Sequence, residues 1–349
     1  MTPRSLLIFA GLTVAALIAA ALAVSGRDAG SAAEDGAGQP LIPGLAQRIN
    51  QVTVLVLADG ARSTTLARSD PGSDRWTIVE KAGHPADTDQ VRRAIVALAG
   101  ARTLEPRTAN PEHYGKLSLD AGATTVTLRG ADGTDLPGLV LGKSVITATP
   151  DHAGSFYARR SAEPQAWLAE GRLPLLSTDP LRWLPRDLPS LPRGRVASVT
   201  VTRSGGGFTI ARKDAAAGDF AFAGPPRAGK PRQTKINDLA GAAEFLACED
   251  VAAADPAAPP PAATTVFRSV EGETLTVRLW LRDGHPWATL TAALEEPARS
   301  PEAAERVKEA RELTRGWSYR LADSVAKDLA PTAEELFEPL APADEVKKK

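Results

Sequence analysis

The fold begins with the run Val52-Thr53-Val54-Leu55-Val56-Leu57, whose β-branched and aliphatic residues predict a strand. The Asp59-Gly60 pair is typical of a tight hairpin turn, and Ser63-Thr64-Thr65-Leu66-Ala67-Arg68 is expected to form the returning strand. Arg75-Trp76-Thr77-Ile78-Val79 adds a third strand. The folded part of the chain therefore opens with an antiparallel meander.

A helix is expected directly after this meander. Asp87 is a suitable N-cap residue, and Gln90, three positions later, is its expected capping-box partner. Val91, Ile95 and Leu98 form an apolar stripe at steps of four and three residues. This stripe predicts that the helix packs on the sheet.

A second meander completes the first unit. Its expected parts are an irregular stretch, two strands that flank the Asp132-Gly133 turn, a last strand and a short helical segment around Gln165-Ala166-Trp167-Leu168. The first four parts span residues 106–122, 124–129, 136–141 and 155–159.

The same order of elements recurs about 145 residues later, which indicates an internal repeat. Val199-Thr200-Val201 matches Val54-Leu55-Val56, and the turn Gly205-Gly206-Gly207 takes the place of Asp59-Gly60. A return strand, a third strand and a helix follow, the helix with a stripe of Ile236, Leu239, Ala243 and Leu246. Three strands come next, then a charged and solvent-facing helix, a strand resembling the one that contains Phe156, and a last helix. These elements after the turn span residues 208–212, 220–222, 236–246, 264–269, 275–282, 287–294, 301–315, 317–321 and 324–329.

An apolar run from Leu6 to Val24 precedes both copies. As a helix it is about 29 Å long, which matches the roughly 30 Å hydrocarbon thickness of a bilayer. We therefore expect an α+β fold, two tandem copies of an antiparallel sheet-plus-helix unit behind one N-terminal transmembrane helix. The expected parts are a cytoplasmic N-terminus, a transmembrane anchor, a flexible linker, repeat unit 1, repeat unit 2 and a basic tail, over residues 1–4, 5–24, 25–48, 49–192, 193–340 and 341–349.

The surroundings of the apolar run predict its orientation. Arg4 precedes it, whereas Arg27 on the far side is offset by nearby acids, which favours an inner-membrane protein with its soluble body in the periplasm. Ala21-Leu22-Ala23 also has the pattern of a signal-peptidase site. Cleavage after Ala23 would instead release a free periplasmic protein.

The composition excludes some classes of function. The chain carries 41 Lys and Arg against 42 Asp and Glu, so no overall charge indicates a nucleic acid as a partner. Its single cysteine, Cys248, lies in an apolar context and is expected to be a buried, inert thiol. The four histidines are too far apart in the sequence for a zinc site, and His84 and His285 are expected in exposed loops.

No catalytic, metal-binding or cofactor-binding residues are predicted. The chain has no Gly-x-Ser-x-Gly elbow, and the Gly205-Gly206-Gly207 turn precedes a strand pattern where a phosphate cradle would precede a helix. Acidic pairs such as Glu295-Glu296 are expected to be solvated. Aromatic residues remain as a possible contact surface, and its candidate residues are Trp183, Trp317, Tyr319 and Tyr157.

Several short motifs together resemble the domain of unknown function 4340 family over residues 52–336. They include Tyr114-Gly115-Lys116-Leu117, Leu139-Val140-Leu141-Gly142 and Leu181-Arg182-Trp183-Leu184-Pro185-Arg186-Asp187-Leu188, which follow a membrane segment and a meander ending in Arg75-Trp76-Thr77-Ile78. Lys116 and the charged insertion after Glu296 depart from the usual pattern. The resemblance implies a bacterial envelope protein that is an accessory partner of ABC-type export permeases, a group that includes gliding-motility auxiliary proteins.

Three functions follow as expectations. The first is a non-enzymatic, membrane-anchored accessory protein that acts as a scaffold or contact subunit for inner-membrane proteins, above all ABC-2-type permease components. The alternative is a periplasmic glycan- or lipid-binding module that uses a cleft between the repeats, with Trp183 and Trp317 as its aromatic residues. A hydrolase whose site is assembled from irregular loops is the third.

Overall fold

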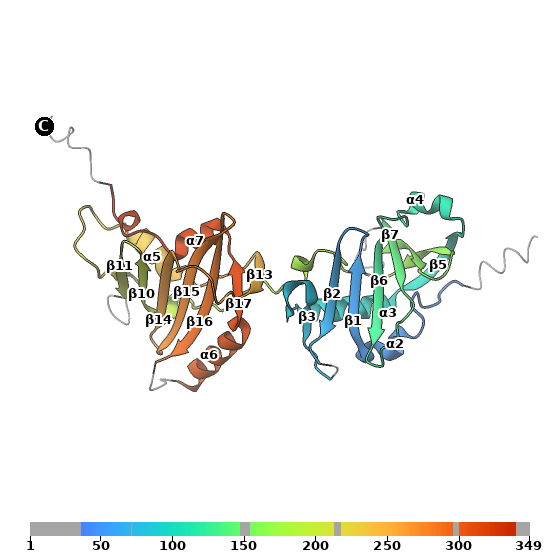
Figure 1. Ribbon diagram of the computed structural model, residues 1–349, viewed down its shortest axis with the longest axis horizontal. Coiled ribbons are helices and arrows are strands. Elements are labelled where there is room, and N and C mark those ends of the chain that lie inside the picture. Colours follow the sequence, from blue (N-terminus) through green and yellow to red (C-terminus); the bar gives the residue numbers. More distant parts are fainter. Residues whose placement is uncertain (1–35, 71, 147–153, 213–217, 296–299, 340–349) are drawn as a thin grey trace, which may run out of the picture. The chain divides into compact units, whose positions relative to one another are not determined.

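The computed structural model describes residues 36–70, 72–146, 154–212, 218–295 and 300–339. The chain divides into two compact units between Trp183 and Leu184, where the sequence pattern placed the division between Pro192 and Arg193. Unit 1 precedes this division and unit 2 follows it (Figure 1). The expected cytoplasmic N-terminus, transmembrane anchor and basic tail lie outside the described residues.

The described residues of unit 1 form one antiparallel sheet of nine strands in the order β4-β3-β2-β1-β6-β7-β8-β9-β5. The strands are β1 (Val52–Ala58), β2 (Ser63–Arg68), β3 (Trp76–Ile78), β4 (His84–Pro85), β5 (Arg102–Thr108), β6 (Thr124–Gly130), β7 (Leu139–Ile146), β8 (Ser155–Arg160) and β9 (Ala166–Glu170). The helices are α2 (Leu45–Arg48), α3 (Thr88–Gly100) and α4 (Tyr114–Leu117), with 3₁₀ turns η1 (Ile49–Gln51), η2 (Val79–Lys81), η3 (Pro111–His113) and η4 (Pro180–Arg182).

The described residues of unit 2 form an antiparallel sheet of eight strands in the order β12-β11-β10-β14-β15-β16-β17-β13. The strands are β10 (Val196–Arg203), β11 (Gly206–Arg212), β12 (Phe220–Phe222), β13 (Asp250–Ala253), β14 (Ala263–Ser269), β15 (Glu273–Arg282), β16 (His285–Leu294) and β17 (Trp317–Arg320). The helices are α5 (Gln233–Gly241), α6 (Pro301–Thr314) and α7 (Asp323–Leu329), with 3₁₀ turns η5 (Arg193–Arg195) and η6 (Glu334–Leu336).

The two sheets repeat one topology. When β4 is left aside, the strand order of unit 1 corresponds strand by strand to that of unit 2. Even a side-chain contact recurs, because Arg68 Nε donates to the Val52 carbonyl at 2.8 Å and Arg212 Nε donates to the Val196 carbonyl at 3.0 Å. Both carbonyls lie at a register shift where the first strand of the unit pairs with its inner neighbour.

The structure corrects the alignment of the two copies by one residue. Val199, which we matched to Val54, is buried and pairs with Ile210. Its counterpart is Leu55, which is buried and pairs with Leu66. A shift of one residue exchanges the two faces of a strand, so the original match placed a core residue against an outer one. In the later strands, β16 corresponds to β8 and β17 to β9.

Each sheet is covered on one face by helices and buries that face. In unit 1 the α3 stripe of Val91, Ile95 and Leu98 is buried, as predicted, and its Asp87 cap accepts from the Gln90 amide at 2.9 Å. In unit 2, Ile236 and Leu239 of α5 are buried in the same way.

Residues 36–48 differ from the expected flexible linker. Leu41, Ile42 and Leu45 are at most 1% exposed, and helix α2 begins at Leu45. The backbone also pairs with strand β5, since the Gly38 amide donates to the Thr103 carbonyl and the Thr103 amide to the Gln39 carbonyl. Three apolar side chains and a free sheet edge therefore attach this segment to unit 1.

Some elements differ from the sequence pattern, and burial on both sides explains the first of these differences. The segment expected to be helical around Gln165-Ala166-Trp167-Leu168 is strand β9, whose first four residues are all buried. Strand β5 overlaps the start of the stretch expected to be irregular, helix α4 lies within that stretch, and β13 has no counterpart in the prediction. Helix α5 ends at Gly241, so Ala243 and Leu246 are buried outside it.

Candidate functional site

The uncovered face of the unit 2 sheet carries a row of small, uncharged side chains, and Arg268 and Arg278 lie on the same face two residues along from Val266 and Thr276. Backbone pairing places the residues of the row side by side across five strands, and none of them is buried. Thr200 Oγ1 and Thr209 Oγ1 share a hydrogen bond of 3.0 Å. From β11 to β16 the row consists of Thr209, Thr200, Val266, Thr276 and Thr291.

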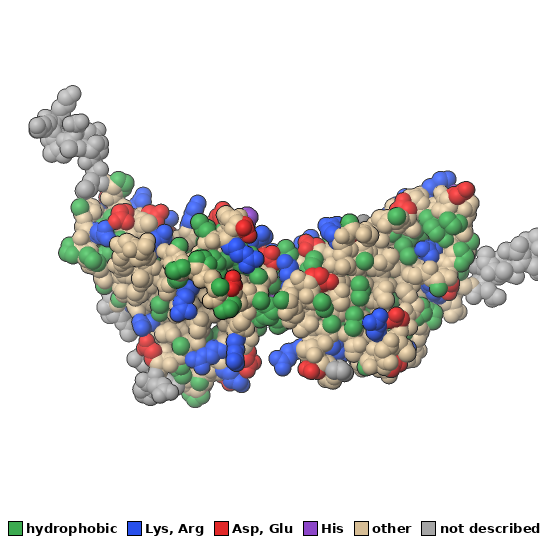
Figure 2. Space-filling model, in the orientation of Figure 1, with side chains coloured by type: hydrophobic (Ala, Val, Ile, Leu, Met, Phe, Trp, Pro, Cys, Tyr) green, Lys and Arg blue, Asp and Glu red, His purple; other side chains and the backbone are tan. Residues whose placement is uncertain are grey.

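The uncovered face of unit 1 has the same character over β1, β2 and β6. Thr65, Val56 and Thr127 are adjacent across the strands and are partly exposed. Towards β9 this face is covered by α4, under which Leu119, Ala123, Val140 and Ala166 form a small buried cluster. Positive and negative side chains are interspersed on the visible side of each unit, without a large field of one sign (Figure 2).

Two of the four aromatic candidates are buried. Trp183 is fully buried, and its Nε1 donates to the Ser177 carbonyl at 2.9 Å. Tyr319 is 2% exposed, its hydroxyl donates to the Leu313 carbonyl at 2.8 Å, and burial raises its pKa. Neither side chain is accessible to a partner or a sugar, so Trp183 cannot serve as a binding residue in the glycan-binding alternative.

The other two aromatic candidates remain partly exposed. Tyr157 packs against the cluster under α4, with the Arg107 guanidinium 6.0 Å from its ring centroid. Trp317 is partly exposed at the start of β17, where it lines a pocket. The structure therefore separates the four candidates, and only these two can contribute to a surface.

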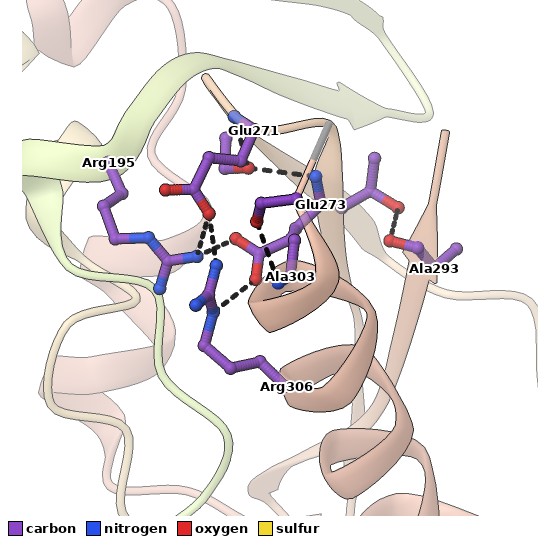
Figure 3. A network of polar contacts seen from close by, with 9 residues as sticks. Arg195, Glu271, Glu273, Ala293, Ala303 and Arg306 are labelled. Atoms are coloured by element: carbon purple, nitrogen blue, oxygen red, sulfur yellow. Dashed lines mark hydrogen bonds and ion pairs between the residues drawn. The ribbon is translucent and has the colours of Figure 1, made fainter. Parts of the chain in front are cut away.

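Four charged side chains that the sequence analysis did not single out meet beside helix α6 (Figure 3). Arg306 Nε donates to Glu273 Oε1 at 2.6 Å, and Arg195 Nη2 binds both Glu271 and Glu273. Burial raises the pKa of Glu273, but the hydrogen bonds and charges of Arg306 and Arg195 outweigh it and leave this pKa below its usual value. All four charges are mutually paired, which suits attachment of α6 better than proton transfer.

The remaining titratable candidates are His84 and Cys248. His84 is buried in strand β4 and not in an exposed loop as expected; burial lowers its pKa, while its contact with the Pro85 carbonyl acts in the opposite sense. Cys248 is buried, as predicted, and burial raises its pKa to about 11. Over the described ranges, no group of three or more His, Cys, Asp or Glu side chains is arranged to hold a metal ion.

In the part of the chain that the structure describes, no helix combines the length and the apolar character that a membrane crossing requires.

Comparison with known proteins gives a family match. The model of the family described as Domain of unknown function (DUF4340) matches residues 76–264. The match begins in strand β3 of unit 1 and ends in strand β14 of unit 2, so it spans the division between the units. No match to a curated protein was found.

Proposed function

Because the chain belongs to the DUF4340 family, whose description names no activity, we propose its function from the surface of the two units. We propose that it is a non-enzymatic contact protein that binds other proteins through the uncovered faces of its sheets. The observation that carries this proposal is the same in both units, a half-exposed row of uncharged threonine and valine side chains across the sheet face opposite the buried one.

Such a face suits protein contact for physical reasons. Antiparallel sheets commonly expose one face to water, and that face then carries polar side chains. Here Val56 in unit 1 and Val266 in unit 2 lie in the middle of the exposed rows, next to threonines. Depletion of charge at the centre and a charged rim are features of protein interfaces.

The location and the partner are part of the proposal. Leu6 to Val24 anchors the protein in the inner membrane by a single pass, and the two units contact ABC-2-type permease components in the periplasm. The length and apolar composition of the run support the anchor. The motif resemblance supports the class of partner.

The test is affinity purification of the full chain from detergent-solubilised membranes, followed by identification of the proteins that remain bound. We compare the wild-type chain with Val56→Arg and Val266→Arg, which place a charge in each uncovered face. The matched control is Val96→Arg, because Val96 is 52% exposed on helix α3, away from the sheet face. Circular dichroism establishes that all three variants are folded.

Permease components that bind the wild-type chain and the Val96→Arg variant, but are lost from one or both face variants, are the expected result. If permease components are absent, or if all three variants retain them equally, the proposal is wrong.

A further inference from the structure

A pocket of about 590 Å³ lies in unit 2 where strands β16 and β17 separate. Strand β17 pairs with β16 only through Trp287 and Ala288. Beyond that point helix α6 packs along β16, and Arg311 Nε donates to the Ala292 carbonyl at 2.8 Å. The space between the end of α6, the start of β17 and the neighbouring strand β15 is the pocket, and its volume is in the range of small-molecule sites.

The pocket gathers positive charge. Arg278 from β15 and Arg311 and Arg315 from the end of α6 line it, against one acid, Glu312, so its lining carries two net positive charges. Among the described residues, neither the Arg278 nor the Arg315 guanidinium has an ion-pair or hydrogen-bond partner. The terminal amino groups of Arg311 are likewise uncommitted within the described ranges.

Helix α6 explains only part of this arrangement. Cations in the last turn of a helix stabilise its dipole, which accounts for Arg311 and for the adjacent Arg315. Arg278 lies in the middle of strand β15, where no helix dipole acts on it. Its presence at the same pocket brings like charges together, which an anionic ligand would neutralise.

Comparison of the units indicates that the pocket is an addition to the repeat. Strands β8 and β9 of unit 1 are joined by a short turn, whereas α6 is inserted between the corresponding β16 and β17. Trp167 of β9 is 9% exposed, and Gly36 of the N-terminal segment lies against its ring. Trp317 in the corresponding strand is partly exposed and forms part of the pocket wall.

We propose that this pocket binds the phosphomonoester group of a small organic molecule. A phosphomonoester carries nearly two negative charges at neutral pH, which matches the two net positive charges of the lining. Guanidinium groups bind phosphate oxygens by paired hydrogen bonds, and the hydroxyls of Thr289 and Thr291 supply further donors. The organic part of the ligand lies against Trp317. The pocket shares Thr291 with the uncovered row of unit 2, but its test measures ligand binding and not protein contact, so the two proposals can fail separately.

The test is isothermal titration calorimetry of the full chain, reconstituted in phosphatidylcholine nanodiscs without detergent, with phenyl phosphate at low ionic strength and pH 7.5. Inorganic phosphate, phenyl sulfate and vesicles containing phosphatidic acid are titrated in parallel. The variants are Arg278→Gln and Arg315→Gln. Arg93→Gln is the matched control, since Arg93 is an exposed arginine of helix α3 in unit 1. Unchanged urea-unfolding midpoints establish that the variants are folded.

We expect one phenyl phosphate to bind per chain, with affinity at least about tenfold weaker in Arg278→Gln and in Arg315→Gln and unchanged in Arg93→Gln. Lowering the pH to 5 should weaken phenyl phosphate binding, because the second phosphate pKa is about 6, and should leave the weaker phenyl sulfate binding unchanged. Tighter binding of phenyl phosphate than of inorganic phosphate is expected from the contact with Trp317.

The source of the group is decided by the vesicle titration. Arg278-dependent binding of phosphatidic acid vesicles without binding of phenyl phosphate supports a lipid headgroup as the ligand, and the reverse supports a soluble phosphoester. If neither binds, or if Arg93→Gln weakens binding as much as Arg278→Gln, the pocket is not a phosphomonoester site.

Discussion

At the scale of single residues, Glu273 couples the attachment of α6 to pH. Its folded-state pKa is lowered from 4.5, so the stabilisation it provides is present above pH 4.5 and is lost as the pH falls through the lower folded value. We expect Glu273→Gln to reduce the free energy of unfolding by about 1–3 kcal/mol at pH 7, and by less at pH 3.5. Urea titrations at both pH values measure the two differences.

The control for this prediction is Glu295→Gln. Glu295 pairs with Arg268 at 2.8 Å, but both side chains are about half exposed, and such surface pairs contribute roughly 0–1 kcal/mol. Equal losses of unfolding free energy for the two variants would contradict the role assigned to the four charged side chains beside α6. A loss for Glu273→Gln that grows as the pH falls would contradict it too.

Arg68 and Arg212 provide a residue-scale test of the repeat. Each guanidinium donates to a backbone carbonyl at the register shift. The Arg68 guanidinium also lies 5.4 Å from the ring centroid of Trp76, and that of Arg212 lies 5.0 Å from the ring centroid of Phe220. We expect Arg68→Met and Arg212→Met each to cost about 1–3 kcal/mol, because a carbonyl at the shift loses its donor.

Urea unfolding followed by tryptophan fluorescence measures both costs. Arg62→Met is the comparison, since the Arg62 side chain is 68% exposed and should lose less than about 0.5 kcal/mol. Because the two sites correspond, Arg68→Met and Arg212→Met are expected to lose similar amounts of unfolding free energy. If either variant is as stable as the wild-type chain, the contact does not stabilise both units.

At the scale of elements, only one of the two hydrogen bonds of the predicted capping box forms at the start of helix α3. Asp87 caps the Gln90 amide as expected, but the Asp87 amide donates to the Trp183 carbonyl at 2.8 Å. We therefore expect Asp87→Ala to cost about 1 kcal/mol and Gln90→Ala to be near neutral. Thermal unfolding of the two variants distinguishes them, and equal losses would restore the full capping box.

This helix also shows what the sequence could and could not predict. Local patterns located α3 and its cap, most strands of both sheets and the repeat, because hairpin turns and apolar stripes are encoded within a few residues. The Trp183 carbonyl that replaces the Gln90 side chain lies far along the chain. Contacts at that separation leave no local pattern, and for the same reason the burial of Trp183 and His84 was missed.

The segment before β1 is the second element with an energetic consequence. Leu41 is fully buried, so Leu41→Ala should lower the stability of unit 1 by about 2–5 kcal/mol. Leu175→Ala is the matched control, because Leu175 is 66% exposed and its loss should be within about 0.5 kcal/mol. Hydrogen exchange adds a second measurement, since the Thr103 amide bonds to the Gln39 carbonyl and should be protected.

At the scale of the whole molecule, each unit has the parts of an independent domain. Each has its own sheet, its own covering helices and its own buried core. We expect residues 36–183 and 184–339, expressed separately, each to unfold cooperatively with strand-rich circular dichroism. A fragment that remains unfolded would show that its core depends on the other unit.

The shared topology also affects how the chain reaches its native state. The two sheets have the same strand order and the same register shift beside β1 and β10, so a hairpin from one unit has pairing geometry that the other can accept. During synthesis unit 1 emerges before the strands of unit 2 exist, whereas refolding from denaturant starts with both sets at once. Refolding therefore has a competing product that synthesis avoids, a chain in which hairpins are exchanged between the two sheets.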